Sequence, residues 1–177
     1  MYHGVIGPGH GFEQIIPLLG IRGNLSYSLT IIGPIKDKYK NELILLSQDN
    51  KNASYLFFKE RMPFAQLINE LTNYHIGIPI HVPNSIQYQT GGTASNKIFE
   101  YAACGIPVLL YNNPQYTENL KKYPWAFFTD LSKDSILNQL HNIVKNYYQV
   151  SPLARNTFAE TINFEKVFTP VLEKYHI

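Results

Sequence analysis

Short apolar segments alternate with amphipathic segments along almost the whole chain, and this alternation constrains the fold more than any other feature of the sequence. The apolar segments are rich in β-branched and aromatic residues and are bounded by Gly, Pro or Asn, which is typical of strands. They are Tyr2–Ile6, Ser28–Gly33, Ser54–Phe58, Ile76–His81, Pro107–Tyr111 and Trp125–Thr129. Because strands that alternate with helices form parallel sheets, we expect an α/β fold with about six parallel strands and helices on both faces.

The amphipathic segments between these strands are predicted to be helices. They are Phe12–Ile21, Asp37–Ser47, Pro63–Asn73, Ser95–Cys104, Pro114–Lys122 and Asp134–Tyr148. The last of them has the clearest apolar stripe, with side chains at spacings of one, three and four residues. Either Ser132 or Asp134 can cap its N-terminus.

Prolines and a polar residue set the expected helix boundaries. Pro17 is expected to kink or shorten the first helix, because proline has no N–H to donate. The C-terminal stretch Leu153–His176 is predicted to form one or two helices, with breaks near Asn163 and at Pro170.

Size, charge and cysteine content exclude several classes of protein. The chain has 177 residues, which is about one domain, and a formal net charge of +2. Its few arginines (Arg22, Arg61 and Arg155) and the lack of a basic run argue against a nucleic-acid partner. The sequence has no apolar stretch near the roughly 20 residues of a membrane span and no signal-peptide pattern. The single cysteine, Cys104, cannot form an internal disulfide, and we expect a cytoplasmic protein.

The loop Gly7–Gly11 lies between the first predicted strand and the first predicted helix. Open α/β sheets bind ligands at the carboxyl ends of their strands, and glycines let backbone N–H groups approach an anion closely. The loop lacks the third glycine of the dinucleotide motif, because Phe12 occupies that position. Taken alone, it is more typical of a tight turn. His10 could donate a hydrogen bond to a phosphate, act as a catalytic group or be an exposed polar residue.

A second polar loop, Thr90–Ala94, leads into the predicted helix that begins at Ser95. Ser95 or Thr93 can cap this helix, whose free N–H groups would face the crevice. Lys97 and Glu100 are three residues apart and are neighbours on one helical face. Glu100 could accept two hydrogen bonds from a vicinal diol such as a ribose, and Lys97 could balance a phosphate charge. Taken alone, the pair is more typical of a surface ion pair worth about 0.3–0.5 kcal/mol.

Four segments of the sequence resemble parts of the C-terminal half of GT-B type glycosyltransferases, which use nucleotide-sugar donors. The segments follow one another along the chain in the same order as in that half. The most specific is NKIFEYAACGIPVLLYNN, at residues 96–113, where a helical Glu is followed by small residues, a Gly, Pro-Val and a strand. YHGVIGPGHGFEQIIPLL, LTIIGPI and YLFFKERMPFAQLINELTNYHIGIPIHVP are similar to the preceding strands, loops and helices of that half. The resemblance implies a single Rossmann-like, donor-binding domain over residues 1–177, with the N-terminal acceptor-binding domain absent from this sequence.

The resemblance also implies roles for individual residues. Glu100 would bind the ribose hydroxyls of the nucleotide, and Arg61, in the loop 59–62, would lie near the base. Lys97 and His10 would stabilise the leaving diphosphate. The remaining binding positions are backbone groups that would contact the donor's phosphates, at Gly9, Gly11, Gly91, Gly92, Thr93 and Ser95.

The sequence departs from the family pattern at three positions. Gly92 stands where many relatives have a second Glu, eight residues before the first. Val5 and His10 stand where many relatives have an Arg and a Lys. The diphosphate charge would therefore be met by His10, Lys97, helix dipoles and backbone amides.

The reaction implied by the resemblance is the transfer of a sugar from a nucleotide-diphosphate-sugar to an acceptor hydroxyl, in polysaccharide or glycoconjugate biosynthesis. No cofactor and no metal is expected. The expected partners are the nucleotide-sugar and an acceptor-binding N-terminal domain or partner chain, and the full enzyme could associate peripherally with a membrane. This half alone is expected to be inactive.

Three alternatives remain open at this stage. The first is a non-catalytic nucleotide-binding or interaction module derived from such a domain. The second is half of a sugar-nucleotide epimerase, which needs acid and base carboxylates; Glu13, Glu60 and Glu118 are available. The third is a flavodoxin-like or nicotinamide-binding protein, against which stands the lack of an acidic residue in Ile31–Lys36.

Overall fold

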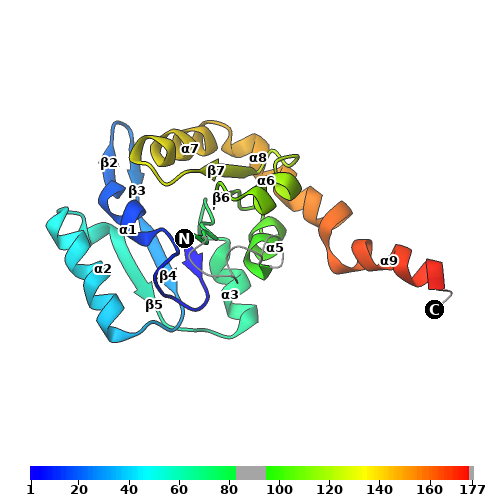
Figure 1. Ribbon diagram of the computed structural model, residues 1–177, viewed down its shortest axis with the longest axis horizontal. Helices are drawn as coiled ribbons and strands as arrows, with labels where there is room; N and C mark the ends of the chain where they lie inside the picture. Colours follow the sequence, from blue (N-terminus) through cyan, green and yellow to red (C-terminus); the bar gives the residue numbers. More distant parts are fainter. Residues whose placement is uncertain (83–94, 176–177) are drawn as a thin grey trace.

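The computed structural model describes residues 1–82 and 95–175, and its parallel strands form two groups (Figure 1). In the first group β4 lies between β1 and β5, and in the second β6 pairs with β7. The bounds are β1 Tyr2–His3, β4 Leu29–Ile32, β5 Leu56–Lys59, β6 Val108–Tyr111 and β7 Ala126–Thr129. All pairings in both groups are parallel, which confirms the expected α/β fold.

The expected strand Ile76–His81 joins the two groups, although its only bridge is between Gly77 and Val108. Ile78 donates its N–H to the carbonyl of Met1, at 3.0 Å, beside β1. The carbonyl of Gly77 accepts the N–H of Leu109, at 2.8 Å, beside β6. Hydrogen bonds on both sides therefore make one continuous layer from β5 to β7.

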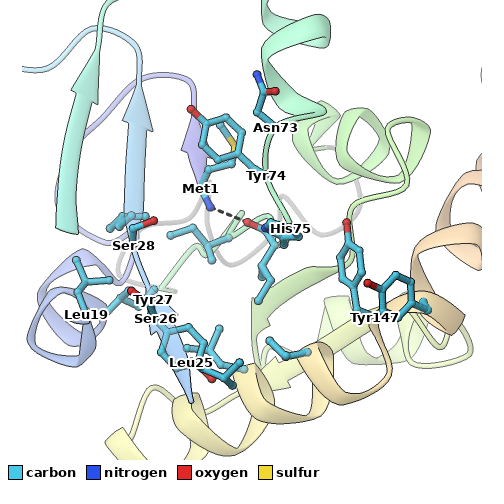
Figure 2. A pocket seen from close by; sticks show the side chains of 17 residues that line it. Met1, Leu19, Leu25, Ser26, Tyr27, Ser28, Asn73, Tyr74, His75 and Tyr147 are labelled. Atoms are coloured by element: carbon cyan, nitrogen blue, oxygen red, sulfur yellow. Dashed lines mark hydrogen bonds between the residues drawn. The ribbon is translucent and has the colours of Figure 1, made fainter. Parts of the chain in front are cut away.

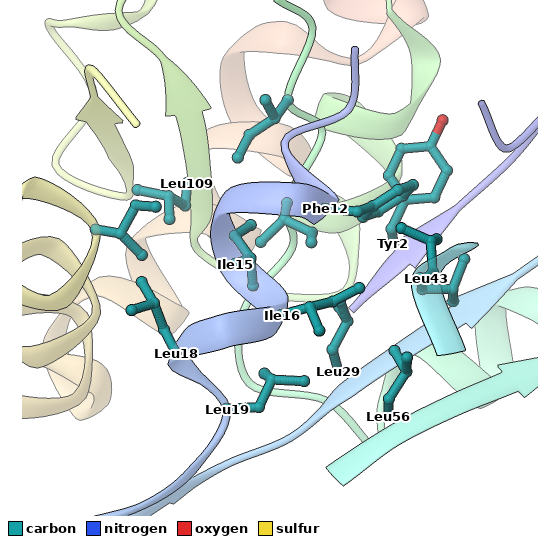
Figure 3. Packing of buried hydrophobic residues seen from close by; sticks show 14 of the residues in the cluster. Tyr2, Phe12, Ile15, Ile16, Leu18, Leu19, Leu29, Leu43, Leu56 and Leu109 are labelled. Atoms are coloured by element: carbon teal, nitrogen blue, oxygen red, sulfur yellow. The ribbon is translucent and has the colours of Figure 1, made fainter. Parts of the chain in front are cut away.

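One face of this layer is covered by three helices, α1 (Phe12–Ile15), α2 (Asp37–Asp49) and α7 (Lys133–Lys145) (Figure 3). The buried side chains that they share with the strands include Tyr2, Phe12, Ile16, Leu29, Ile31, Leu43, Leu109, Ile136 and Ile143. Each such side chain stabilises the fold by about 1.5–3 kcal/mol when it is fully removed from water.

The opposite face is covered by α3 (Phe64–Leu71), α5 (Asn96–Ala103), α6 (Pro114–Leu120) and α8 (Tyr147–Thr157). Val108 and Leu110 of β6 pack in this second cluster, whereas Leu109 packs in the first. This alternation is the two-residue period of a strand that is buried on both faces. It also confirms helices on both faces of the sheet.

The first predicted helix is shortened, as expected from Pro17. It ends at Ile15 and continues as a 3-10 turn, Ile16–Leu18, which contains Pro17. The chain then forms an antiparallel hairpin of β2 (Gly20–Arg22) and β3 (Leu25–Tyr27), which the sequence analysis does not predict. The missing N–H of Pro17 explains the early end of the helix.

The C-terminal stretch forms α8, a π-helical turn at Phe158–Ile162, and α9 (Phe164–Tyr175). The expected break near Asn163 is confirmed. The expected break at Pro170 is wrong, because Pro170 lies inside α9; one proline removes a single backbone hydrogen bond, and an exposed helix can bend around its ring. Figure 1 shows α9 projecting away from the rest of the chain. Its exposed apolar side chains are Phe164, Val167, Phe168, Val171 and Tyr175.

Within residues 1–82 and 95–175, no helix is both long and apolar enough to cross a membrane.

Candidate functional site

A cavity of about 340 Å³ opens at the carboxyl ends of β1, β4 and β5. His3 and Gly4 line it from the end of β1, Gly33 from the turn after β4, and Arg61 from the loop after β5. The side chains of α3 close it, among them Phe64. The cavity thus lies at the sheet edge where open α/β folds bind ligands, and it includes the predicted residue Arg61.

The tight packing of two turns shapes this cavity. Gly33 has φ +137°, and a Cβ at this position would overlap the carbonyl oxygen of Gly4. Gly4 itself has φ +121°. The ends of β1 and β4 can therefore approach this closely only with glycine at position 33.

Glu100, the predicted ribose ligand, lies on α5 and is half-buried. One of its carboxylate oxygens, Oε2, is 3.2 Å from Nε2 of His3. Burial raises the pKa of Glu100, and the nearby charge of Lys97 opposes that shift. Glu100 therefore belongs to a partly desolvated group of charges next to the cavity and not to an exposed helix surface.

Lys97 extends from the first turn of α5 toward the Gly4 backbone. A Cβ placed on Gly4 would lie 3.5 Å from Lys97 Nζ, and this ammonium is 5.5 Å from the centre of the Tyr2 ring. Burial lowers the pKa of Lys97, and Glu100 opposes that shift. A partly buried ammonium that lies near an aromatic ring and feels the charge of a nearby carboxylate is suited to meeting an anion.

His10 is buried, with 4% of its surface exposed. Its Nδ1 lies 3.0 Å from the carbonyl oxygen of Ile80, to which a ring N–H can donate, and its Nε2 lies 3.1 Å from the hydroxyl of Tyr2. Burial lowers the pKa of His10, and the hydrogen bond to Ile80 opposes that shift. These contacts favour a role in fixing the glycine loop, and direct contact with a phosphate stays a prediction.

The neighbouring glycines of this loop pack against the segment that joins the two strand groups. The carbonyl of Gly9 accepts the N–H of Val82, at 2.8 Å. Gly11 has φ +73° and lies against Ile80. The structure therefore places Gly9 and Gly11 beside His10, and through Tyr2 it connects them to Lys97.

Ser95 is the N-cap residue of α5, but its side chain makes no capping hydrogen bond. Its hydroxyl oxygen is buried and has no hydrogen-bond partner among residues 1–82 and 95–175. The other three predicted phosphate positions, Gly91, Gly92 and Thr93, lie outside the described residues.

His3 is a residue that the sequence analysis missed. It ends β1, is 4% exposed, and faces the Glu100 carboxylate. No sequence signal could have identified it, because a histidine at the end of a strand has many ordinary explanations. Its importance follows only from the position of α5 next to β1.

A larger cavity of about 590 Å³ lies at the opposite, amino edge of the strands (Figure 2). Tyr27, Tyr74 and Tyr147 line it together with many aliphatic side chains, and none of its lining residues is Asp, Glu, Lys or Arg. It contains none of the predicted site residues, so the smaller cavity is the better candidate for the site. Among the described residues, no three His, Cys, Asp or Glu side chains are grouped so that they could hold a metal ion.

Comparison with solved structures identifies the fold. HepE from Anabaena, solved in complex with UDP, superposes with a TM-score of 0.74 at 14% identity, over 99% of this chain and 48% of HepE. A glycosyltransferase from Rickettsia africae gives a TM-score of 0.76 at 14% identity, over 98% of this chain and 46% of that enzyme. The chain has the fold of one half of a GT-B glycosyltransferase.

A third GT-B structure agrees. WaaG, a glycosyltransferase involved in lipopolysaccharide biosynthesis, matches with a TM-score of 0.68 at 12% identity, over 97% of this chain and 46% of its own. This chain therefore spans about half the length of each of these solved structures. No family model matches the sequence, and no curated protein matches it either.

Proposed function

We propose that this GT-B half binds a nucleoside diphosphate sugar and, together with an acceptor-binding half, transfers the sugar to an acceptor hydroxyl. The observation that carries the proposal is that Glu100 and Lys97 lie against His3 and Gly4, which line the cavity at the carboxyl ends of the strands. The structures of HepE contain UDP, and one of them contains UDP and glucose. They support a nucleotide as the ligand class.

In this proposal each subsite has its own group of residues. Glu100 accepts hydrogen bonds from the ribose diol, and the base occupies the cavity beside Arg61. Lys97, Ser95 and the first N–H groups of α5 meet the diphosphate, because a helix N-terminus carries a partial positive charge. As the donor bond breaks, negative charge develops on the diphosphate, and these groups stabilise it.

The acceptor-binding half is an N-terminal domain or a partner chain, and we propose that it contacts α9. About half of each solved relative has no counterpart in this chain. α9 presents an exposed apolar stripe, in which Phe164 is 70% exposed and Val167 is 61% exposed. A stripe of this kind on a helix marks an interaction surface. Until that half is present, binding without turnover is expected.

A specific observation favours a second candidate, a non-catalytic nucleotide-binding module. Val5 is 75% exposed at the rim of the cavity, where many relatives have an Arg. Without the charge of that Arg, the positive electrostatic potential at the cavity is weaker than in such relatives, but it would still allow a nucleotide to bind. Sugar transfer after the acceptor-binding half is added would distinguish the enzyme from the module.

Titration calorimetry with UDP tests the ligand class. Glu100→Gln is expected to weaken UDP binding about tenfold or more, because hydrogen bonds to a charged acceptor are worth about 1.5–3 kcal/mol. Glu173→Gln, at an exposed position on α9, is the matched control and should bind UDP as the unaltered chain does. Equal UDP affinity in Glu100→Gln and Glu173→Gln would contradict the assignment of the ribose to Glu100.

A further inference from the structure

The His3 side chain is held rigidly against the carboxylate of Glu100. Its backbone pairs with Ile32 of β4, and its ring contacts Tyr101 edge to face, with ring centres 4.9 Å apart. Tyr101 is fully buried, donates its hydroxyl to the carbonyl of Met1 and fits against Gly77, where a Cβ would overlap its ring. The imidazole therefore has little freedom to turn away from Glu100.

The contact between His3 and Glu100 is close but incomplete. His3 Nε2 and Glu100 Oε2 are 3.2 Å apart, yet the buried Nε2 makes no hydrogen bond with any residue that the structure describes, so the two atoms are within range but poorly aligned. Burial, with the charge of Lys97, lowers the pKa of His3 to about 4, so the ring is neutral at pH 7. A neutral ring facing a carboxylate carries its proton on the facing nitrogen. A buried polar nitrogen without a partner lowers the stability of the fold.

We propose that His3 is a positioning residue for nucleotide binding: its Nε2–H holds Oε2 of Glu100, so that Oε1 is presented to the ribose diol of the ligand. This inference rests on the proposed function. A small rotation of the half-buried Glu100 side chain on binding aligns the hydrogen bond and pairs the buried nitrogen. His3 thus acts through Glu100 and does not itself contact the ribose.

The structure argues against a purely packing role for His3. Its edge-to-face contact with Tyr101 requires only an aromatic ring, and phenylalanine would supply that ring without a buried polar atom. The Nε2 nitrogen is useful only because it faces Glu100. Removal of Nε2 should therefore affect a ligand that uses Glu100 and should not affect a ligand that does not.

The test compares UDP with 2′,3′-dideoxy-UDP, which lacks the diol, by titration calorimetry on the full chain. His3→Phe is expected to weaken UDP binding about tenfold and to change binding of the dideoxy ligand less than twofold. His3→Gln, whose amide nitrogen reaches about as far as Nε2, should retain UDP affinity. His3→Asn, whose amide is too short to reach Glu100, should lose affinity as His3→Phe does.

His141→Phe, on the exposed face of α7, is the control and should leave both affinities unchanged. Equal losses of UDP and dideoxy-UDP in His3→Phe would overturn the inference, and so would no loss of either. If UDP binds the unaltered chain with an affinity that His3 does not influence, only this inference fails. If UDP does not bind the unaltered chain at all, the proposed function fails and the inference fails with it. Should His3→Phe not fold, the contrast between His3→Gln and His3→Asn decides.

Discussion

At the scale of single residues, Gly33 is the position with the least tolerance for change. Its φ of +137° is a conformation that side chains rarely adopt, and a Cβ would overlap the Gly4 carbonyl. We expect Gly33→Ala to lower the free energy of unfolding by about 2–4 kcal/mol, measured by urea denaturation. Gly7→Ala is the matched control, because a Cβ on Gly7 meets nothing within 4 Å; it should stay within about 0.5 kcal/mol. Equal effects of the two variants would contradict this account.

The sequence predicts part of the candidate site at this scale. Lys97 and Glu100 are three residues apart on a predicted helix, so their proximity follows from helical geometry, and the structure places both near the end of β1. The contact of His3 with Glu100 could not be predicted, because it depends on how α5 packs against β1. The burial of His10 could not be predicted either, since its partners Tyr2 and Ile80 come from separate parts of the chain.

At the scale of elements, helix capping differs between α7 and α5. Ser132 accepts the N–H of Ser135 with its side-chain oxygen, at 3.3 Å, whereas Ser95 makes no capping bond. Ser132→Ala is therefore expected to lower the free energy of unfolding by about 1 kcal/mol, and Ser95→Ala should leave it nearly unchanged. Thermal melts of the two variants without ligand provide the measurement. A loss in Ser95→Ala as large as that in Ser132→Ala would show that Ser95 stabilises the helix.

A helix can be predicted from the sequence where its apolar periodicity extends over several turns. The stripe of α7 covers several turns and was located to within a few residues at each end. The sequence predicts that Pro17 shortens the first helix, which the structure confirms, but it does not predict the hairpin that follows at residues 20–27. The Gly23-Asn24 pair between β2 and β3 is a known hairpin signal and could have revealed that turn. The single bridge at Gly77 depends on both neighbouring strands and so has no local signal.

At the scale of the whole molecule, three buried histidines, His3, His10 and His81, make stability depend on pH. Burial lowers the pKa of His3 to about 4 and that of His81 to about 3, from an ordinary value of 6.5. Below pH 6.5 the unfolded chain binds protons that the folded chain does not. The stability that the neutral, buried histidines contribute is therefore full above pH 6.5 and is lost as pH falls toward 4 and 3. Between pH 7 and pH 5.5 we expect His3 and His81 to contribute a loss of about 2–3 kcal/mol, and the lowered pKa of His10 adds to this loss.

Urea denaturation at pH 7 and pH 5.5 measures this loss. In the variant His81→Gln the difference between the two pH values should shrink by about 1 kcal/mol, because one of the buried histidines is gone. His141→Gln, at an exposed position, should keep the full difference. Stability that does not change between the two pH values would show that none of the buried rings resists protonation.

Lys97 and Glu100 are carried by a single helix, one turn apart, and neither belongs to the glycine loop. A tilt or shift of α5 would move the ammonium and the carboxylate together, as one rigid unit. In the proposed function, recognition of the pentose and neutralisation of the phosphoryl groups are therefore mechanically linked. Variation in the length of the sequence that precedes α5 can change where this unit stands but not the spacing between its two charges.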